Sequence, residues 1–257
     1  MPSSYAHYRF GKQVLSAMPA EAKQCVTRFR RMYDLGTQGP DFFFYFNPLC
    51  STTIGGLGSH FHTQSGQRFF EGACRAATSE AARAYLYGLL CHYCLDSACH
   101  PFVEAKDSCG EAGHVALESE FDRYLLAMDG VESPHTHNLS SKMKLTRGEC
   151  MTVATFYPPA TGANVYQAVG FMAFALRFLA NPHRSRIRRL LKLVKPSLQD
   201  SLIPEEPVEA FARMDSELLA RFNRAVKGYP AMLEQLMAHM ATGELLGEDF
   251  QPPFGNT

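Results

Sequence analysis

The sequence of 257 residues contains no tryptophan, and its valine and isoleucine residues together number only 14. Alanine and leucine number 55, which favours helix over sheet because β-branched side chains are the ones that suit strands. Neither sign of charge is in excess, with 25 basic and 25 acidic residues, so no whole-molecule field attracts nucleic acid or an anionic membrane. An apolar content of 46% excludes a disordered or collagen-like chain.

Long apolar runs are also missing. The best stretch, residues 165–180, contains Arg177 and falls short of the roughly 18 uncharged residues of a membrane-spanning helix. The N-terminal sequence MPSSYAHYRF lacks the basic start and apolar centre of a secretory signal. We therefore expect a cytoplasmic protein whose eight cysteines are reduced thiols. Cys91, Cys94 and Cys99 lack paired CxxC spacing, so we interpret them as buried packing residues.

Helical periodicity dominates the chain. Helices are predicted over residues 8–18, 21–35, 67–77, 79–100, 114–128, 163–179, 184–195, 208–227 and 231–242. Pro101 is expected to close one of these helices, and loops are expected over residues 39–58, 104–113, 130–140 and 196–207. Because there is no internal repeat and no low-complexity tract, we predict one all-α domain, a helical bundle over residues 1–257.

The strongest local signal is LLCHYCLDSACHPF, in which His92, Asp96 and His100 share one helix face at spacings of four residues. Imidazole and carboxylate both suit zinc, although a lone HxxxD pattern is more often a plain polar helix face. His114 and Glu118 repeat the spacing in GHVALESEFD on the next predicted helix. Two such pairs on neighbouring helices favour a metal site, because helical bundles build metal sites from inward-facing groups of this kind.

Four further residues, all earlier in the sequence, are weaker candidates for metal ligands. His7 lies at the start of the first predicted helix, Asp41 follows Gly-Pro, and His60 and His62 lie in the glycine-rich IGGLGSHFH. An aspartate after proline is usually a turn residue, and HxH is often at the surface. Their value is that they complete a set of metal ligands.

The order of these residues resembles the zinc-dependent phospholipase C family, which shares a trinuclear zinc core and a helical fold with secreted single-strand-specific zinc nucleases. GHVALE and HYCLDSACHP are the most specific parts of the resemblance. It covers about residues 1–125, with 126–257 as helical scaffold, and it implies a multinuclear site of three zinc ions per chain. The resemblance implies that one ion is held by Asp41, His62, His92 and Asp96, and a second by His100, His114 and Glu118. It implies that the third ion is held by His7, by Asp96 as a bridging carboxylate, and by the main chain of the N-terminal residue.

The sequence departs from the secreted members of the family at two points. Their N-terminal tryptophan, whose amine and carbonyl bind zinc, has no counterpart here, and we hypothesise that Met1 is removed and that Pro2 takes this role. Asp96 and His100 are four residues apart where the secreted phospholipases have six.

Of the two histidines of HxH, the family pattern of a glycine followed four residues later by histidine favours His62 over His60 as the ligand.

The resemblance implies a phospholipase C-like hydrolase that cleaves a phospholipid headgroup or a similar phosphodiester, with Asp41 as the catalytic base that orients a metal-bound hydroxide. Two alternatives stay open. One is a single-strand nuclease or nucleotidase on the same metal core, and the other is a non-catalytic metal-binding helical protein.

Two segments bear on the substrate. GPDFFFYFNPL places five aromatic residues after Asp41, which either line the mouth of the site or, as we favour, belong to the core. The basic segment from Arg184 to Lys195 has an apolar stripe, namely Ile187, Leu190, Leu191 and Val194. We interpret it first as a solvated helix over a core stripe, with peripheral membrane contact or phosphate binding as alternatives. No obligate protein partner is evident.

Overall fold

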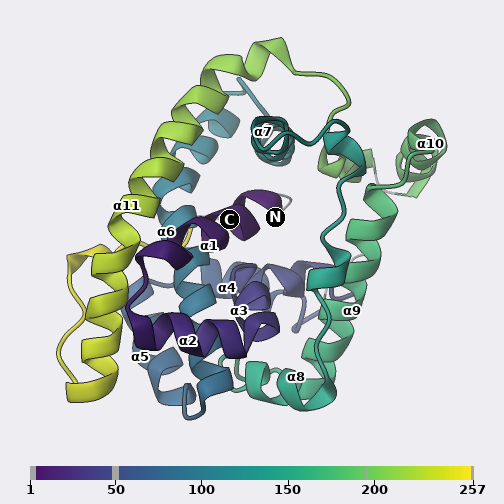
Figure 1. The fold of residues 1–257 in the computed structure, drawn as a ribbon. Coiled ribbons are helices and arrows are strands. Elements are labelled where there is room, and N and C mark those ends of the chain that lie inside the picture. Colours follow the sequence, from purple (N-terminus) through teal and green to yellow (C-terminus); the bar gives the residue numbers. More distant parts are fainter. Residues whose placement is uncertain (1–3, 48–51, 195, 256–257) are drawn as a thin grey trace.

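The computed structural model describes residues 4–47, 52–194 and 196–255, and these residues form a helical bundle without a strand (Figure 1). The predicted fold class, a single all-α domain, is confirmed. The α-helices are α1 (Ser4–Val14), α2 (Ala20–Arg28), α3 (Arg30–Gly36), α4 (Leu57–His62), α5 (Gly66–Ala76), α6 (Glu80–Ser108), α7 (His114–Met128), α8 (Arg147–Ala154), α9 (Gly162–Leu179), α10 (Arg184–Val194) and α11 (Ala212–Thr242). The 3₁₀ helices used below are η2 (Gly39–Tyr45), η3 (Pro134–Thr136), η5 (Pro196–Ser201) and η7 (Glu248–Phe250).

Helix α6 runs through the middle of the bundle. Its N-cap residue Ser79 accepts a hydrogen bond from the backbone N–H of Ala82, which stabilises the first turn. From Ala82 to His100 the helix is buried on nearly all sides, as expected of a helix whose apolar residues are not confined to one stripe. Helices α1, α2, α3 and α11 pack against it, and α11 follows it over much of its length (Figure 1). Side chains that point outward from α6 therefore lie in the interior of the protein.

Two of the predicted helix boundaries, at Pro101 and between residues 227 and 231, were wrong. Helix α6 continues past Pro101 to Ser108, and α11 continues past Pro230 where two helices were predicted. A proline removes only one backbone donor, and the hydrogen bonds of the turns on either side, together with packing, hold the helix. The predicted helix over residues 21–35 is instead divided at Phe29, whose φ of −112° and ψ of 46° are not helical.

The region predicted as one long loop, residues 39–58, contains η2 and the start of α4. In η2, Phe42 and Phe43 are fully buried, so the interpretation of these aromatic residues as core is confirmed for them. Helix α8 was not predicted, although Thr146 and Glu149 form a capping box at its start.

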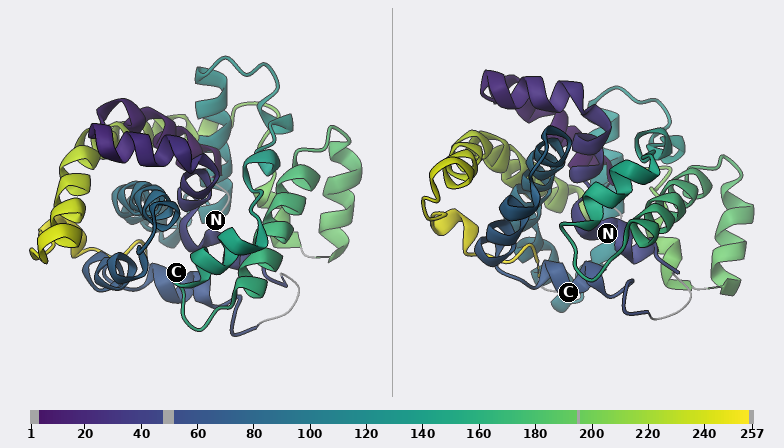
Figure 2. Two further views of the ribbon diagram at one scale, coloured as in Figure 1. Left: turned by 60° about the horizontal axis from the view of Figure 1, so that its bottom comes forward. Right: turned by 90° about the horizontal axis from the view of Figure 1, so that it is seen from below.

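The end of α9, α10 and η5 form a lobe at the edge of the bundle (Figure 2). Its small apolar cluster, made by Ile187, Leu191 and Leu202, is separate from the main core. Leu190 is 47% exposed, so the predicted stripe is buried only in part, and Leu193, which lies outside that stripe, is 80% exposed. The side chain of Val194 and all of Lys195 lie outside the described residues. Among the helices described here, none combines the length and the apolar character that crossing a membrane requires.

Candidate metal centre

Imidazole and carboxylate groups from five elements meet in the interior of the bundle. Helix α6 contributes three of them because residues at spacings of four share a face. The full set is His7 on α1, Asp41 on η2, His62 on α4, His92, Asp96 and His100 on α6, and His114 and Glu118 on α7. All are buried except His114, which is half-buried. The structure thus brings together eight side chains that lie up to 111 positions apart (118 − 7) in the sequence.

Asp96 lies at the middle of the cluster. Its Oδ2 atom is 2.9 Å from Nε2 of His92 and 3.3 Å from Nε2 of His62. Its Oδ1 atom is 3.2 Å from Nε2 of His7 and 3.7 Å from Nε2 of His100. Burial alone raises the pKa of Asp96, but the surrounding imidazoles, His100 and His92 foremost, hold that pKa well below its usual range. Both carboxylate oxygens of Asp96 therefore face nitrogen donors, and the group is ionised.

Asp41 and His62 form the side of the cluster next to Asp96. Asp41 Oδ1 is 3.1 Å from Nε2 of His62 and 3.9 Å from Nε2 of His92. The Nδ1–H of His62 donates to the backbone oxygen of Gly58 at 2.7 Å, which turns Nε2 toward the two carboxylates. Burial raises the pKa of Asp41, but the nearby imidazoles of His92 and His62 outweigh it and lower that pKa to about 2.

A second group lies between α6 and α7. Glu118 Oε1 is 3.2 Å from Nε2 of His114 and 3.4 Å from Nε2 of His100. Burial raises the pKa of Glu118, but hydrogen bonds from the two imidazoles help to hold that pKa well below the usual range. Because the side chain of His114 is 27% exposed, this group lies nearest to the surface.

The donor atoms fit a cluster of zinc ions. Three groups of side chains each have donor atoms within 4.8 Å of one another. The first group is His7, Asp41 and His92, and the second is His62, His92 and Asp96. The third group is His100, His114 and Glu118. Asp41 Oδ1 and Asp96 Oδ2 are buried without a hydrogen bond of good geometry, although imidazole nitrogens lie 3.1 and 2.9 Å away. Nitrogen and oxygen atoms that converge in this way suit a cation between them, and imidazole with carboxylate is a donor set for zinc.

A family model for zinc-dependent phospholipase C matches residues 6–156, which is more than half of the chain. The chain belongs to the zinc-dependent phospholipase C family. The resemblance inferred from the spacing of histidine and carboxylate residues is therefore confirmed, and the family is one of hydrolases. No curated protein and no solved structure gave a match.

The structure separates the remaining histidines from the cluster. His60 is exposed, and its Nε2 atom lies 2.8 Å from Nε2 of Gln64, whereas His62 points inward. His135 and His137 line a large cavity next to α1. Pro2, the hypothesised main-chain ligand, lies outside the described residues. The seven described cysteines are free thiols, and none of them belongs to the three groups of donor atoms.

Sequence reasoning missed the residues that enclose the cluster. The ring of Phe254 lies 5.9 Å from those of His62 and His92, between centroids, and the N–H of Gly255 donates to the oxygen of His62 at 3.2 Å. A Cβ on Gly255 would lie 2.0 Å from Nδ1 of His100. No local pattern could have indicated this contact, because Phe254 and Gly255 are distant in sequence from every predicted ligand.

A missed carboxylate, Asp122, holds the start of α1. Its Oδ2 and Oδ1 atoms accept hydrogen bonds from the backbone N–H groups of Tyr5 and Ala6 at 3.0 and 2.8 Å. Because Asp122 is 1% exposed, burial raises its pKa to about 7. The signal was present, since His114, Glu118 and Asp122 follow one another at the same four-residue spacing as the three residues on α6.

Proposed function

We propose that this member of the family hydrolyses the phosphodiester bond of a phospholipid headgroup, using three zinc ions held by the eight clustered side chains. The observation that supports this most is the position of Asp96. Its two oxygens face imidazoles that fall in different groups of donor atoms, so that one carboxylate can bridge two ions.

The proposed assignment of ligands follows the family pattern. Asp41, His62, His92 and Asp96 would hold one ion, and His100, His114 and Glu118 a second. His7 and Asp96 would hold the third, together with the main chain of Pro2. The contacts between His7 and Asp96, and between Glu118 and both of its histidines, support this grouping.

Bound zinc supplies a water molecule of lowered pKa and neutralises charge on the phosphoryl oxygens. Asp41 is ionised at neutral pH because its pKa is lowered to about 2, so it can accept a hydrogen bond from the attacking water and orient it. The oxygen of that water joins phosphorus, and the bond from phosphorus to the diacylglycerol oxygen breaks. The diacylglycerol oxygen takes up a proton, and the headgroup leaves with the phosphate.

The aromatic residues after Asp41 favour a lipid over a single-stranded nucleic acid. Phe42 and Phe43 lie edge-on to Tyr157, with ring centroids 5.7 and 5.3 Å apart, and are fully buried. They cannot offer a face on which bases stack. Phe44 is the half-buried member of the series and lines the large apolar cavity next to α1.

We propose that α10 makes peripheral contact with a membrane. Leu190 and Leu193 are exposed on this helix, as are the basic side chains of Arg186, Arg188, Arg189 and Lys192. Apolar side chains next to basic ones on an amphipathic helix are typical of helices that lie on an anionic bilayer surface.

The direct test is hydrolysis by the zinc-loaded protein of phosphatidylcholine vesicles and, separately, of a single-stranded oligonucleotide. We expect release of phosphocholine and diacylglycerol from the vesicles. Asp41→Asn should abolish this release, whereas Asp200→Asn, the same change at an exposed position, should not. Turnover of the oligonucleotide without turnover of lipid would contradict the proposed substrate. Absence of turnover of either would contradict the proposed activity.

A further inference from the structure

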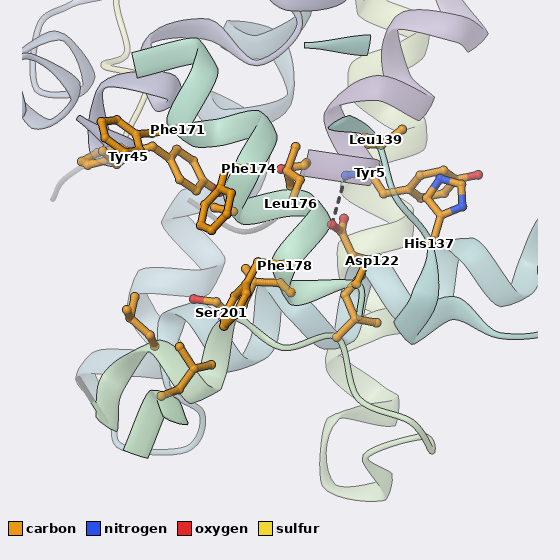
Figure 3. A pocket seen from close by; sticks show the side chains of 18 of the residues that line it. Tyr5, Tyr45, Asp122, His137, Leu139, Phe171, Phe174, Leu176, Phe178 and Ser201 are labelled. Carbon is orange, nitrogen blue, oxygen red and sulfur yellow. Dashed lines mark hydrogen bonds between the residues drawn. The ribbon is translucent and has the colours of Figure 1, made fainter. Parts of the chain in front are cut away.

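A cavity of about 620 Å³ lies between the start of α1, the segment that carries η3, and the lobe of α9, α10 and η5. The rings of Phe171, Phe174 and Phe178 project into it from α9 (Figure 3). Phe171 and Phe174 are 40% and 56% exposed, so these rings are not packed in the core. A volume of this size falls within the range of roughly 300–1,000 Å³ for pockets that enclose small ligands.

Tyr5, His137 and Asp122 lie together at the other side of the cavity, while Tyr45 and Ser201 lie on the side of the phenylalanine rings (Figure 3). Asp122 is bound to the backbone of α1, so its charge is not directed at a ligand. Among the lining residues, the other titratable groups on this side are imidazoles and phenols rather than lysine, arginine or glutamate. The cavity therefore suits a ligand that is mostly hydrocarbon and has one polar end.

The polar side of the cavity adjoins the metal centre. Tyr5 precedes His7 by two residues on α1, and Asp122 follows Glu118 by one turn on α7. The ring of Phe44, which lines the cavity, has its centroid 5.6 Å from that of His62. A ligand in the cavity thus has its polar end beside the residues that hold the metal.

We propose that this cavity binds one hydrocarbon chain of the lipid whose phosphodiester is hydrolysed at the metal centre. This inference rests on the proposed function, and it adds a determinant of substrate selection. The chain lies against Phe171, Phe174 and Phe178, while the glycerol and phosphate remain at the polar end. The enzyme therefore selects substrates by chain length as well as by headgroup.

The position of α10 supports a lipid chain as the occupant. Leu191 faces the cavity from α10, while Leu190 and Leu193 on the same helix are exposed among basic residues. The helix proposed to touch the bilayer is therefore also a wall of the cavity. A chain that leaves an anionic bilayer at α10 reaches the cavity without crossing the core of the bundle.

The test uses the zinc-loaded protein and monomeric phosphatidylcholines with dibutyryl, dipentanoyl and dihexanoyl chains, each kept below its micelle-forming concentration. Their headgroup is constant, and no lipid surface is present. Burying one methylene contributes about fourfold to binding, so kcat/KM should rise by up to about fourfold for each carbon added per chain. Glycerophosphocholine, which has no chain, is the reference.

Ala175→Phe fills the cavity from α9, and Ala180→Leu, directly after the end of α9, fills it with a smaller side chain. Either variant should bring the ratio of the dihexanoyl to the dibutyryl rate toward one. Ala163→Phe, on the exposed surface of the same helix, should keep the wild-type ratio. Binding of cis-parinaric acid, followed by its fluorescence, should be saturable in the wild type and weakened in both cavity variants, which provides a readout that does not depend on catalysis.

Each outcome has a definite meaning. Equal kcat/KM for all chain lengths would overturn the inference and leave the proposed function intact. That result combined with saturable cis-parinaric acid binding would mean that the cavity holds a separate lipid rather than the chain of the substrate. An unchanged chain-length ratio in a folded Ala175→Phe or Ala180→Leu protein would also overturn the inference. No hydrolysis of any of these phosphodiesters would contradict the proposed function itself.

Discussion

At the scale of single residues, the cluster depends on groups that cannot be exchanged without moving a ligand. Asp96 contacts four imidazoles, and His62 is turned inward by its hydrogen bond to Gly58. Gly39 has a φ of 51°, and a Cβ at this position would lie 2.2 Å from Cδ2 of His92. The backbone of η2 can approach the imidazole closely only because residue 39 is glycine.

We expect Gly39→Ala to displace His92 and to weaken zinc binding by at least about 10–100-fold, the loss typical of disturbing the groups that orient a ligand. Zinc affinity is measured by competition with a chromogenic chelator. Gly130→Ala is the matched control, because Gly130 has a φ of 78° but nothing lies within 4 Å of the added Cβ. Equal zinc affinities in the two variants would show that the position of His92 does not depend on Gly39.

At the scale of elements, buried titratable side chains lie where α7 meets α11. Arg123 donates two hydrogen bonds from Nε and Nη2 to Glu120 Oε1 at 2.8 and 2.6 Å. Asp215, in the first turn of α11, is 2% exposed, and its Oδ1 atom has no hydrogen-bond partner. Burial, and secondarily the charge of Glu120, raises the pKa of Asp215 to about 7.

This raised pKa predicts a pH-dependent contribution to stability. The folded state keeps the proton on Asp215 up to about pH 7, whereas the unfolded chain loses it near pH 3.9. The folded state therefore binds more protons between these values, so the contribution of Asp215 to stability is fully present below this window and is lost as pH rises through it. Asp215→Asn removes the effect, and we expect the variant to gain roughly 1–3 kcal/mol over the wild type by pH 8.

The measurement is urea denaturation of both proteins at pH 5 and pH 8. The difference in the free energy of unfolding should shift in favour of Asp215→Asn at the higher pH. Asp200→Asn, at an exposed position, should show no such shift. A difference between Asp215→Asn and the wild type that is the same at both pH values would contradict the assignment.

The elements also show how far the sequence can be interpreted. Helix α7 begins and ends where it was predicted, because Gly113 and Gly130 flank a continuous apolar pattern. Pro101 misled the prediction because a proline on an exposed side of a long helix loses one hydrogen bond while tertiary packing keeps the rest. The eight clustered residues could be named from spacing and resemblance, since ligands on a helix recur every four residues. Phe254 and Gly255 could not, because only the folded chain brings them to the cluster.

At the scale of the whole molecule, the segment after α11 returns to the metal centre. Pro252 accepts a hydrogen bond from the N–H of Gly66 at 2.9 Å, and the ring of Phe254 lies 4.8 Å from that of Tyr93 on α6, between centroids. Phe254 is fully buried. The family match ends at residue 156, so this wall of the cluster is supplied by a part of the chain outside it.

We expect Phe254→Ala to destabilise the protein by about 3–5 kcal/mol, the usual loss for removing a buried aromatic ring. Because this ring packs on His62 and His92, the variant should also release zinc more readily to a chelator. Thermal denaturation with and without the chelator measures both effects. Leu245→Ala, 86% exposed in the same segment, should change stability by less than about 0.5 kcal/mol. Wild-type zinc retention in a folded Phe254→Ala protein would contradict a role for this ring at the cluster.

The measurement that tests the central proposal most directly is metal content by elemental mass spectrometry, on protein purified without a histidine tag and with its native N-terminus. We predict three zinc ions per chain in the wild type, fewer in Asp96→Asn, and an unchanged number in Asp200→Asn. Loss of Asp96 removes the carboxylate whose two oxygens face His7, His62 and His92. Absence of stoichiometric zinc from the wild-type protein would contradict the proposed metal centre and the hydrolysis derived from it.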